Sequence, residues 1–218
     1  MHRILCSFVA TLLLAVAGLL PAPEALAQKA PDELVKSVAE DVLAIVRQDR
    51  ALREGDNSRM AQLIEEKIVP HFDFERMTRL AVGRSWRQAT PEQRQQLIDE
   101  FRRLLVRSYS AAYSTYNHIV VEVKPLKLQP GEEDVQVKTL IKLPGGAPPV
   151  SVDYSMVNNS PDWKVYDVVV DGISLVTTYR TTFAEEVNKG GIEGLLKSLA
   201  ALNAAKTAQR PVGATRRQ

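Results

Sequence analysis

Acidic residues in the second half of the chain are the first candidates for chemistry. Asp153, Asp167 and Asp171 lie in or directly after segments that alternate between apolar and polar residues. A partly buried aspartate with a raised pKa can act as a general base near neutral pH, so catalysis is one hypothesis. Asp171 precedes Gly172, however, and this pair is typical of a turn. Solvated and turn-forming roles therefore explain these acids more simply.

The histidines and glycines form none of the common catalytic motifs. His71 and His118 fall in different predicted elements, without an HExxH pair or a Cys/His cluster. Gly145-Gly146 separates two predicted strands and Gly190-Gly191 follows a predicted helix, so neither pair forms a phosphate-binding loop. No GxSxG elbow is present. We expect a protein that is not an enzyme and that has neither a metal site nor a cofactor.

The first 27 residues have the layout of a secretory signal peptide. Arg3 precedes an apolar run over residues 4–20, and the small residues of Ala25-Leu26-Ala27 follow it. We predict cleavage before Gln28. A membrane anchor is the alternative, but the run is short for a spanning helix and no second apolar segment follows. Lipidation of Cys6 would leave most of the run uncut and is not expected.

The remaining chain has the length of one domain. Residues 28–204 are predicted to form it, and residues 205–218 are predicted to be a flexible tail. Cys6 is the only cysteine, so the mature domain must be stabilised by packing without disulfides. A formal net charge of +2 and 6% aromatic residues give no strong basic field. We therefore expect no nucleic-acid partner.

The first half of this domain is predicted to be helical. After Pro31, apolar residues recur at helical spacing through Ile45, and a second amphipathic stretch ends at Pro70. Thr90-Pro91-Glu92-Gln93 has the pattern of a helix start, with Thr90 as N-cap, and opens the longest helix. One side of that helix carries Leu97, Phe101, Leu104, Leu105, Tyr109 and Tyr113. The other side is charged and is explained by solvation: Arg94, Asp99, Arg102, Arg103 and Arg107.

Near Asn117 the pattern changes to strict alternation, which predicts strands. Four strands are expected, joined as an antiparallel meander, at residues 119–124, 135–143, 150–157 and 163–170. Two helices close the domain, and the first ends at Gly190-Gly191. The sequence thus predicts an α+β fold with a helical N-terminal half, a four-stranded antiparallel sheet and two C-terminal helices.

From Pro70 onward, short motifs follow one another in an order that is hard to meet by chance: Asp73-Phe74, Met77, Ala81-Val82-Gly83, Trp86, Ala89-Thr90-Pro91-Glu92-Gln93, Leu105-Val106-Arg107-Ser108-Tyr109, Trp163-Lys164-Val165-Tyr166-Asp167-Val168, Asp171-Gly172-Ile173-Ser174-Leu175-Val176 and Tyr179-Arg180. In these motifs the chain resembles the MlaC family, the periplasmic phospholipid-binding component, also called the toluene-tolerance auxiliary protein, of an ABC transporter. Thr178 departs from the amide expected before Tyr179-Arg180, which concerns only the local hydrogen bonding of that turn.

The resemblance implies a periplasmic carrier whose cargo is a bound phospholipid. It implies that the carrier shuttles lipid between an outer-membrane lipoprotein-porin complex and an inner-membrane ABC transporter complex with a lipid-binding, membrane-anchored subunit, and so maintains the lipid asymmetry of the outer membrane. Each buried CH₂ group is worth about 0.8 kcal/mol, so two chains of about 16 carbons resist entering water by on the order of 25 kcal/mol. The fold should therefore enclose an apolar cavity, with the head group at its mouth.

The last predicted strand suggests where that cavity lies. Simple alternation places Val165 and Val169 on one face and Val168 and Val170 on the other, so the second apolar face needs either a helix or a ligand as its partner. We favour a ligand between this strand and the helix over residues 179–187. The predicted lipid-binding neighbourhood comprises Trp86, Tyr109, Tyr113, Val168, Val170, Ile173, Leu175, Tyr179 and Phe183. Arg180 is the candidate for the lipid phosphate, with a structural ion pair as the alternative.

Two other classes of protein remain open. An isomerase or a hydrolase would place an acid deep in the cavity, and Asp167, predicted to face the same side as Val165 and Val169, is the candidate. A protein-interaction module or chaperone would use the apolar surface for a protein partner and would carry no lipid.

Overall fold

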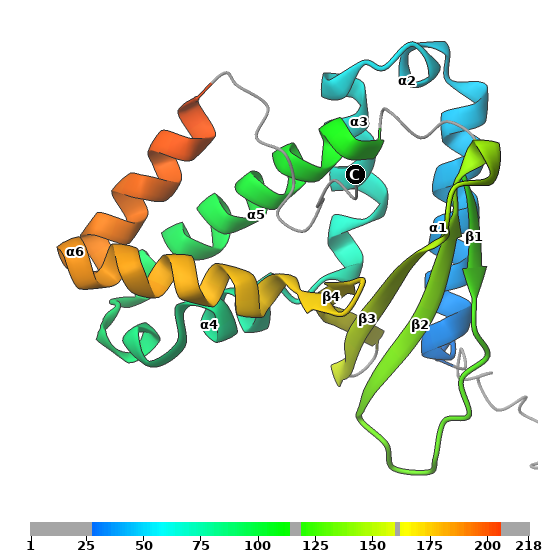
Figure 1. Cartoon of the computed structure of the whole chain (residues 1–218). Coiled ribbons are helices and arrows are strands. Elements are labelled where there is room, and N and C mark those ends of the chain that lie inside the picture. The colour runs from blue at the N-terminus through cyan, green and yellow to red at the C-terminus, as the bar shows by residue number, and fades with distance from the viewer. Residues whose placement is uncertain (1–27, 114–118, 160–161, 206–218) are drawn as a thin grey trace, which may run out of the picture.

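The computed structural model describes residues 28–113, 119–159 and 162–205 (Figure 1). The first half contains α1 (Pro31–Gln48), α2 (Arg50–Arg53), α3 (Asn57–Lys67), η1 (Val69–His71), α4 (Phe74–Val82), η2 (Gly83–Gln88) and α5 (Pro91–Tyr113). The second half contains β1 (Val120–Val123), β2 (Asp134–Lys142), η3 (Pro144–Gly146), β3 (Val150–Asn159), β4 (Asp162–Val170), β5 (Ile173–Ser174) and α6 (Leu175–Ala204). The α+β class is therefore confirmed. The predicted signal peptide and residues 206–218 of the predicted tail lie outside the described residues.

The sheet has five strands in the order β1-β2-β3-β4-β5, and every neighbouring pair is antiparallel. The sequence predicted four strands. The additional strand, β5, has two residues and pairs Ile173 with Val170. It follows a tight turn at Asp171 and Gly172, whose φ angles of 47° and 82° are left-handed. Two residues are too few for alternation to reveal a strand, although the turn itself was predicted.

The C-terminal segment bends where a break between two helices was predicted. It forms α6, which changes direction at Gly190 and Gly191, as Figure 1 shows. Gly191 has a φ of 66° and a ψ of −162°, a conformation that residues with a Cβ avoid. The glycine pair thus ends the first helical run, and the second run continues in a new direction.

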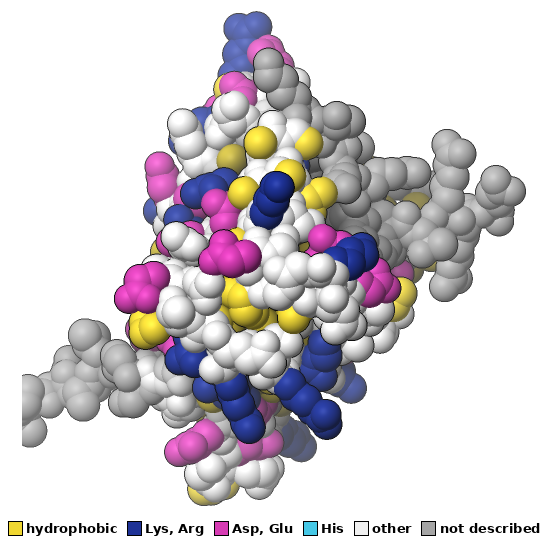
Figure 2. All heavy atoms as spheres, turned by 90° about the vertical axis from the view of Figure 1, so that its left-hand side faces the viewer, with side chains coloured by type: hydrophobic (Ala, Val, Ile, Leu, Met, Phe, Trp, Pro, Cys, Tyr) yellow, Lys and Arg dark blue, Asp and Glu magenta, His cyan; other side chains and the backbone are white. Residues whose placement is uncertain are grey.

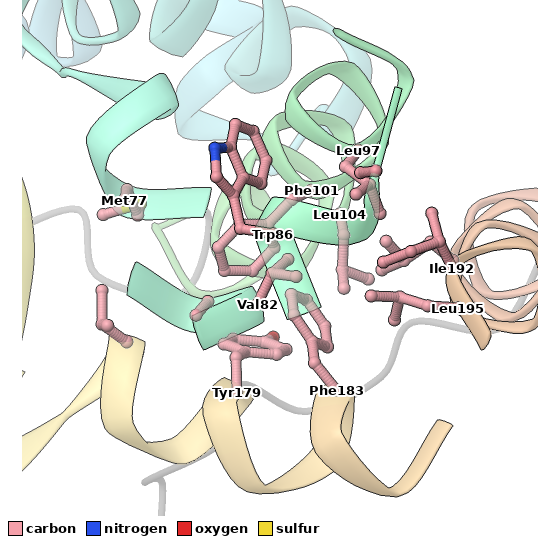
Figure 3. Close-up of a cluster of buried hydrophobic side chains, with 14 of the residues drawn as sticks. Met77, Val82, Trp86, Leu97, Phe101, Leu104, Tyr179, Phe183, Ile192 and Leu195 are labelled. Carbon is pink, nitrogen blue, oxygen red and sulfur yellow. The ribbon is translucent and has the colours of Figure 1, made fainter. Parts of the chain in front are cut away.

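The largest core lies among α4, η2, α5 and α6 (Figure 3). These helices form the end of the molecule away from the sheet (Figure 1), which we call the helical end. Phe101 in α5 is completely buried, and its ring meets the rings of Tyr179 and Phe183 edge-on at centroid distances of 4.9 and 5.0 Å. Further buried side chains surround these rings: Met77, Ala81, Val82, Trp86, Leu97, Leu104, Ile192, Leu195 and Leu199. This core fixes α6 against α5.

The two ends of α5 are fixed by polar contacts. At its start, the Thr90 N–H donates to Gln93 Oε1 at 3.0 Å and the Gln93 N–H donates to Thr90 Oγ1 at 3.2 Å, which confirms the predicted capping box. Towards its end, the Arg107 guanidinium donates to the carbonyls at the end of α6, those of Leu202, Asn203 and Ala205. The expectation that Arg107 is merely solvated is therefore wrong.

Helix α1 joins the helical end of the molecule to the sheet. Its second half packs through Val42 and Val46 against buried side chains of α2, α3 and α5. Its first half packs through Leu34 and Val35 against a cluster on the sheet. The sheet cluster consists of Val135, Val137, Met156, Trp163 and Val165. The helical end and the sheet therefore have separate cores.

Candidate functional site

A β-bulge decides which side chains of β4 share a face. The register between β3 and β4 shifts and leaves Tyr166 as an extra residue. Val165 therefore lies on the same face as Val168 and Val170, and Val169 lies on the opposite face. The prediction that Val165 lies opposite Val168 and Val170 is wrong, because simple alternation does not count the bulged residue. We call the face with Val165, Val168 and Val170 the apolar face.

Only part of the apolar face belongs to a packed cluster. The part of this face that bears the sheet cluster is covered by α1, through Leu34 and Val35. The strand pairings place five further aliphatic side chains on the same face: Val121, Ile141, Val150, Val152 and Val170. We call these five the distal half. None of them belongs to the three hydrophobic clusters of the described residues, and all except Val152 are half-buried. The distal half is therefore the aliphatic part of this face that lies outside the packed clusters of the described residues.

The candidate general base has a structural role on the opposite face. Asp167 accepts hydrogen bonds from Ser174 Oγ at 2.6 Å and from the Val176 N–H at 3.1 Å. Ser174 is the N-cap of α6, and its hydroxyl in turn accepts from the Thr177 N–H at 3.0 Å. The carboxylate thus completes the cap of α6 and lies near the positive end of the helix dipole.

The cap gives a prediction that separates structure from catalysis. Replacing Asp167 with alanine removes the acceptor for a backbone N–H, so we expect the free energy of unfolding to fall by about 1–2 kcal/mol. Asp167→Asn keeps one acceptor oxygen and should lose less. Urea unfolding of both variants measures the difference, and bound phospholipid should be nearly unchanged. An alanine variant as stable as the parent would contradict the capping role.

The other two acids are also held by local hydrogen bonds. Asp171 Oδ1 accepts from the Ser151 N–H at 3.1 Å, and Asp153 Oδ1 accepts from Ser151 Oγ at 3.3 Å. Both contacts stabilise the end of the sheet beside the β4–β5 turn. Among the described residues, no group of three or more His, Cys, Asp or Glu side chains is placed to hold a metal ion.

Four residues of the predicted lipid-binding neighbourhood belong to the core of the helical end. Trp86, Tyr179 and Phe183 are core residues with exposed fractions of 8%, 9% and 2%, and Tyr109 packs against the same cluster. Leu175 is buried at the start of α6. Burial raises the pKa of the Tyr179 hydroxyl. The rings of Tyr179 and Phe183 point toward α5 in Figure 3, so the helix over residues 179–187 uses them to pack against α5.

The other predicted residues lie apart from that core. Val168 and Val170 are half-buried on the apolar face of the sheet, whereas Ile173 is 45% exposed in β5. Arg180 is exposed and donates from Nε to the Leu80 carbonyl at 2.9 Å. Tyr113 ends α5, but its side chain lies outside the described part of the structure. The structure therefore divides the nine predicted residues whose side chains it describes between the helical core, the start of α6, the sheet and the surface.

Sequence reasoning overlooked most of the distal half. Val121, Ile141, Val150 and Val152 occupy alternate positions in three strands, and their pairing brings them beside Val170. The alternation was visible in the sequence. Which alternate set shares a face with Val170 depends on strand register, and the periodicity of a single strand does not give that register.

Two hollows lie outside the distal half. One of about 300 Å³ has a mostly apolar wall and lies between α4, η2 and α6; its lining is Arg79, Leu80, Gly83, Arg84, Trp86, Arg87 and Arg180. The other, of about 280 Å³, is more polar and is lined by Val38, Asp41, Glu66, Lys67, Pro70 and His71. Burial, and then the charge of Lys164, lower the pKa of His71. Pockets for drug-sized ligands measure about 300–1,000 Å³, so neither hollow has room for two long acyl chains.

The domain combines a packed helical end with an aliphatic sheet surface outside the packed clusters, an arrangement that suits the binding of an apolar partner or ligand. No helix of the described residues has the length and apolar character needed to cross a bilayer. The chain belongs to the MlaC family, because the family model described as MlaC protein matches residues 36–201. The resemblance noted in the sequence is thereby confirmed.

Individual relatives agree with this assignment. The chain is 20% identical over 177 residues to the "Intermembrane phospholipid transport system binding protein MlaC" of Haemophilus influenzae, with 80% of this chain and 83% of the relative covered. It is 25% identical over 167 residues to the "Toluene tolerance protein ttg2D" of Pseudomonas putida, with 76% of each covered. Among solved structures, the phospholipid-binding protein of Ralstonia solanacearum, in complex with a phospholipid, matches with a TM-score of 0.75 and 38% identity, covering 81% of this chain and 98% of the other.

Proposed function

We propose that this chain is a periplasmic phospholipid carrier. Membership of the MlaC family and the likeness to a protein solved with a phospholipid support phospholipid binding and transport. We further propose the route implied by the family resemblance. The carrier exchanges lipid with an outer-membrane lipoprotein-porin complex and with an inner-membrane ABC transporter complex that has a membrane-anchored, lipid-binding subunit. The names of the relatives, which refer to a phospholipid transport system and to toluene tolerance, agree with such a route.

The distal half of the sheet is the observation that carries the proposal. Val121, Ile141, Val150 and Val170 keep part of their aliphatic surface exposed although they share one face. Each fully buried aliphatic side chain gains about 1.5–3 kcal/mol relative to an exposed one. An acyl chain laid on this surface would remove its own CH₂ groups and these side chains from water together.

The proposal revises the predicted binding residues. Val170 stays in the proposed acyl site, joined by the other aliphatic residues of the distal half, whereas Val168 packs against the sheet cluster. Trp86, Tyr179 and Phe183 are better explained as core of the helical end. Arg180 lines a hollow to which the sheet contributes no residue, so we do not assign it to the lipid phosphate.

Native mass spectrometry of the protein purified from the cell envelope tests the proposal. We expect a complex with stoichiometric phospholipid, which solvent extraction and lipid analysis would identify. The denatured mass should correspond to a chain that begins at Gln28, which tests the predicted cleavage. As a control, protein refolded without lipid should regain phospholipid from liposomes. A lipid-free mass together with no uptake from liposomes would contradict carriage and favour a protein-interaction module.

A further inference from the structure

Four arginines surround the hollow between α4, η2 and α6: Arg79, Arg84, Arg87 and Arg180. All four side chains are exposed, and Leu80 and Trp86 contribute to the mostly apolar wall between them. Figure 2 faces the helical end of the molecule and shows Lys and Arg side chains gathered over its lower part. We call this surface, with its four arginines and its apolar wall, the arginine-rimmed hollow.

The positive charge of this surface is not neutralised within the described chain. No described carboxylate lies within 4.0 Å of any of the four guanidinium groups. Several arginines outside the hollow do have such a partner, since Arg59, Arg76 and Arg103 each pair with an aspartate or a glutamate. Clustered like charges repel one another, so an anionic partner would stabilise this surface.

One contact fixes part of the rim. Arg180 Nε donates to the Leu80 carbonyl at the end of α4, which ties the guanidinium to the edge of the hollow. The two terminal nitrogens of Arg180 have no partner among the described residues. They can donate to a carboxylate in a bidentate manner.

The combination of an apolar wall and a basic rim points to one kind of occupant. We propose that the arginine-rimmed hollow binds an acidic segment of a partner protein, which inserts one apolar side chain between the arginines. Binding hot spots have this arrangement, with an apolar anchor in a pocket and charged residues around it. A phospholipid fits less well, because a hollow of about 300 Å³ has no room for two long acyl chains beside the phosphate. A volume of about 300 Å³ suits a side chain better than a folded element.

The surface is separate from the proposed lipid site. None of the residues that line the hollow belongs to the sheet. A partner whose anchoring side chain enters this hollow would not cover the distal half with that side chain. Partner binding and lipid loading can therefore be measured independently, and the failure of one would not imply the failure of the other.

Fluorescence anisotropy with a defined peptide tests the inference on the mature, lipid-loaded protein. The probe is a short fluorescein-labelled peptide with a single leucine between glutamates. Arg84→Gln combined with Arg87→Gln should weaken binding about tenfold, since each lost charge contact costs up to about 1 kcal/mol. The matched control, Arg47→Gln combined with Lys127→Gln, removes the same charge from exposed positions outside the hollow and should bind as the parent does.

The apolar anchor is tested with a second peptide in which serine replaces the leucine. It should bind at least tenfold more weakly, because burial of a leucine is worth about 1.5–3 kcal/mol. Equal binding of the two peptides, or equal binding by the arginine variant and its control, would overturn the proposal. Arginine-dependent sedimentation with phosphatidylglycerol vesicles, without arginine-dependent peptide binding, would assign the surface to a membrane instead. Native mass spectrometry should find the same lipid load in the variant and the parent.

Discussion

Replacing Phe101 with alanine is expected to lower the free energy of unfolding by about 3–5 kcal/mol, the range for large-to-small changes of a buried aromatic residue. Phe101 is fully buried and makes edge-on contacts with both Tyr179 and Phe183. The truncation leaves a cavity where α5 and α6 meet and removes two aromatic contacts that add to the burial energy. In a domain of this size the melting temperature should fall by roughly 10 °C.

Equilibrium unfolding in urea, followed by circular dichroism, measures this loss. Ile173→Ala is the control, because this side chain is 45% exposed and its truncation should change stability by less than about 0.5 kcal/mol. If Phe101→Ala cost less than about 1 kcal/mol, the helical end would not depend on this aromatic cluster. That result would also contradict the inference that Tyr179 and Phe183 stabilise the domain as core residues.

The parts of the fold that were predicted correctly depend on interactions between near neighbours in sequence. Thr90 and Gln93 form their capping box within one helical turn, and the conformation at Asp171 and Gly172 follows from residue types that tolerate positive φ. Such signals are complete in a short stretch of sequence. They therefore fix where elements begin and end.

The errors involve contacts between distant segments. In the sequence, Arg107 lies on the charged side of a helix. Only the packed fold brings the end of α6 to its guanidinium. Likewise, the extra residue Tyr166 in β4 is defined by its pairing with β3, so the sequence of β4 alone cannot reveal it. Tertiary contacts decided both cases.

The same distinction explains the partial success with the binding residues. Periodicity showed that Tyr179 and Phe183 have a buried side, but it did not show whether a ligand or α5 covers that side. Simple alternation gives the strand of Val168 and Val170 two apolar faces, which predicts a partner for both faces. Both valines do lie on the apolar face, although the bulge also brings Val165 there. Burial can be inferred from one segment, whereas the identity of the covering group needs the others.

The apolar face of the sheet allows lipid binding to be tested with a matched pair of variants. Val170 and Val169 are neighbours in β4, and both are half-buried, but only Val170 lies on the apolar face. Val170→Asn is expected to reduce the affinity for phospholipid about tenfold, because an amide buried against hydrocarbon without a partner costs about 1–3 kcal/mol. Val169→Asn introduces the same group on the opposite face and should leave lipid binding almost unchanged.

Competition between variant and parent for a limiting amount of phospholipid in liposomes, read by native mass spectrometry, compares these affinities directly. Val170 belongs to none of the packed clusters of the described residues, so its replacement should disturb folding little, and the urea midpoints of the two variants should be similar. A selective loss of lipid in Val170→Asn would therefore arise from the ligand and not from the fold. If both variants loaded as the parent does, the acyl chains would have to lie elsewhere. The distal half would then have no part in carriage, even in a protein that carries phospholipid.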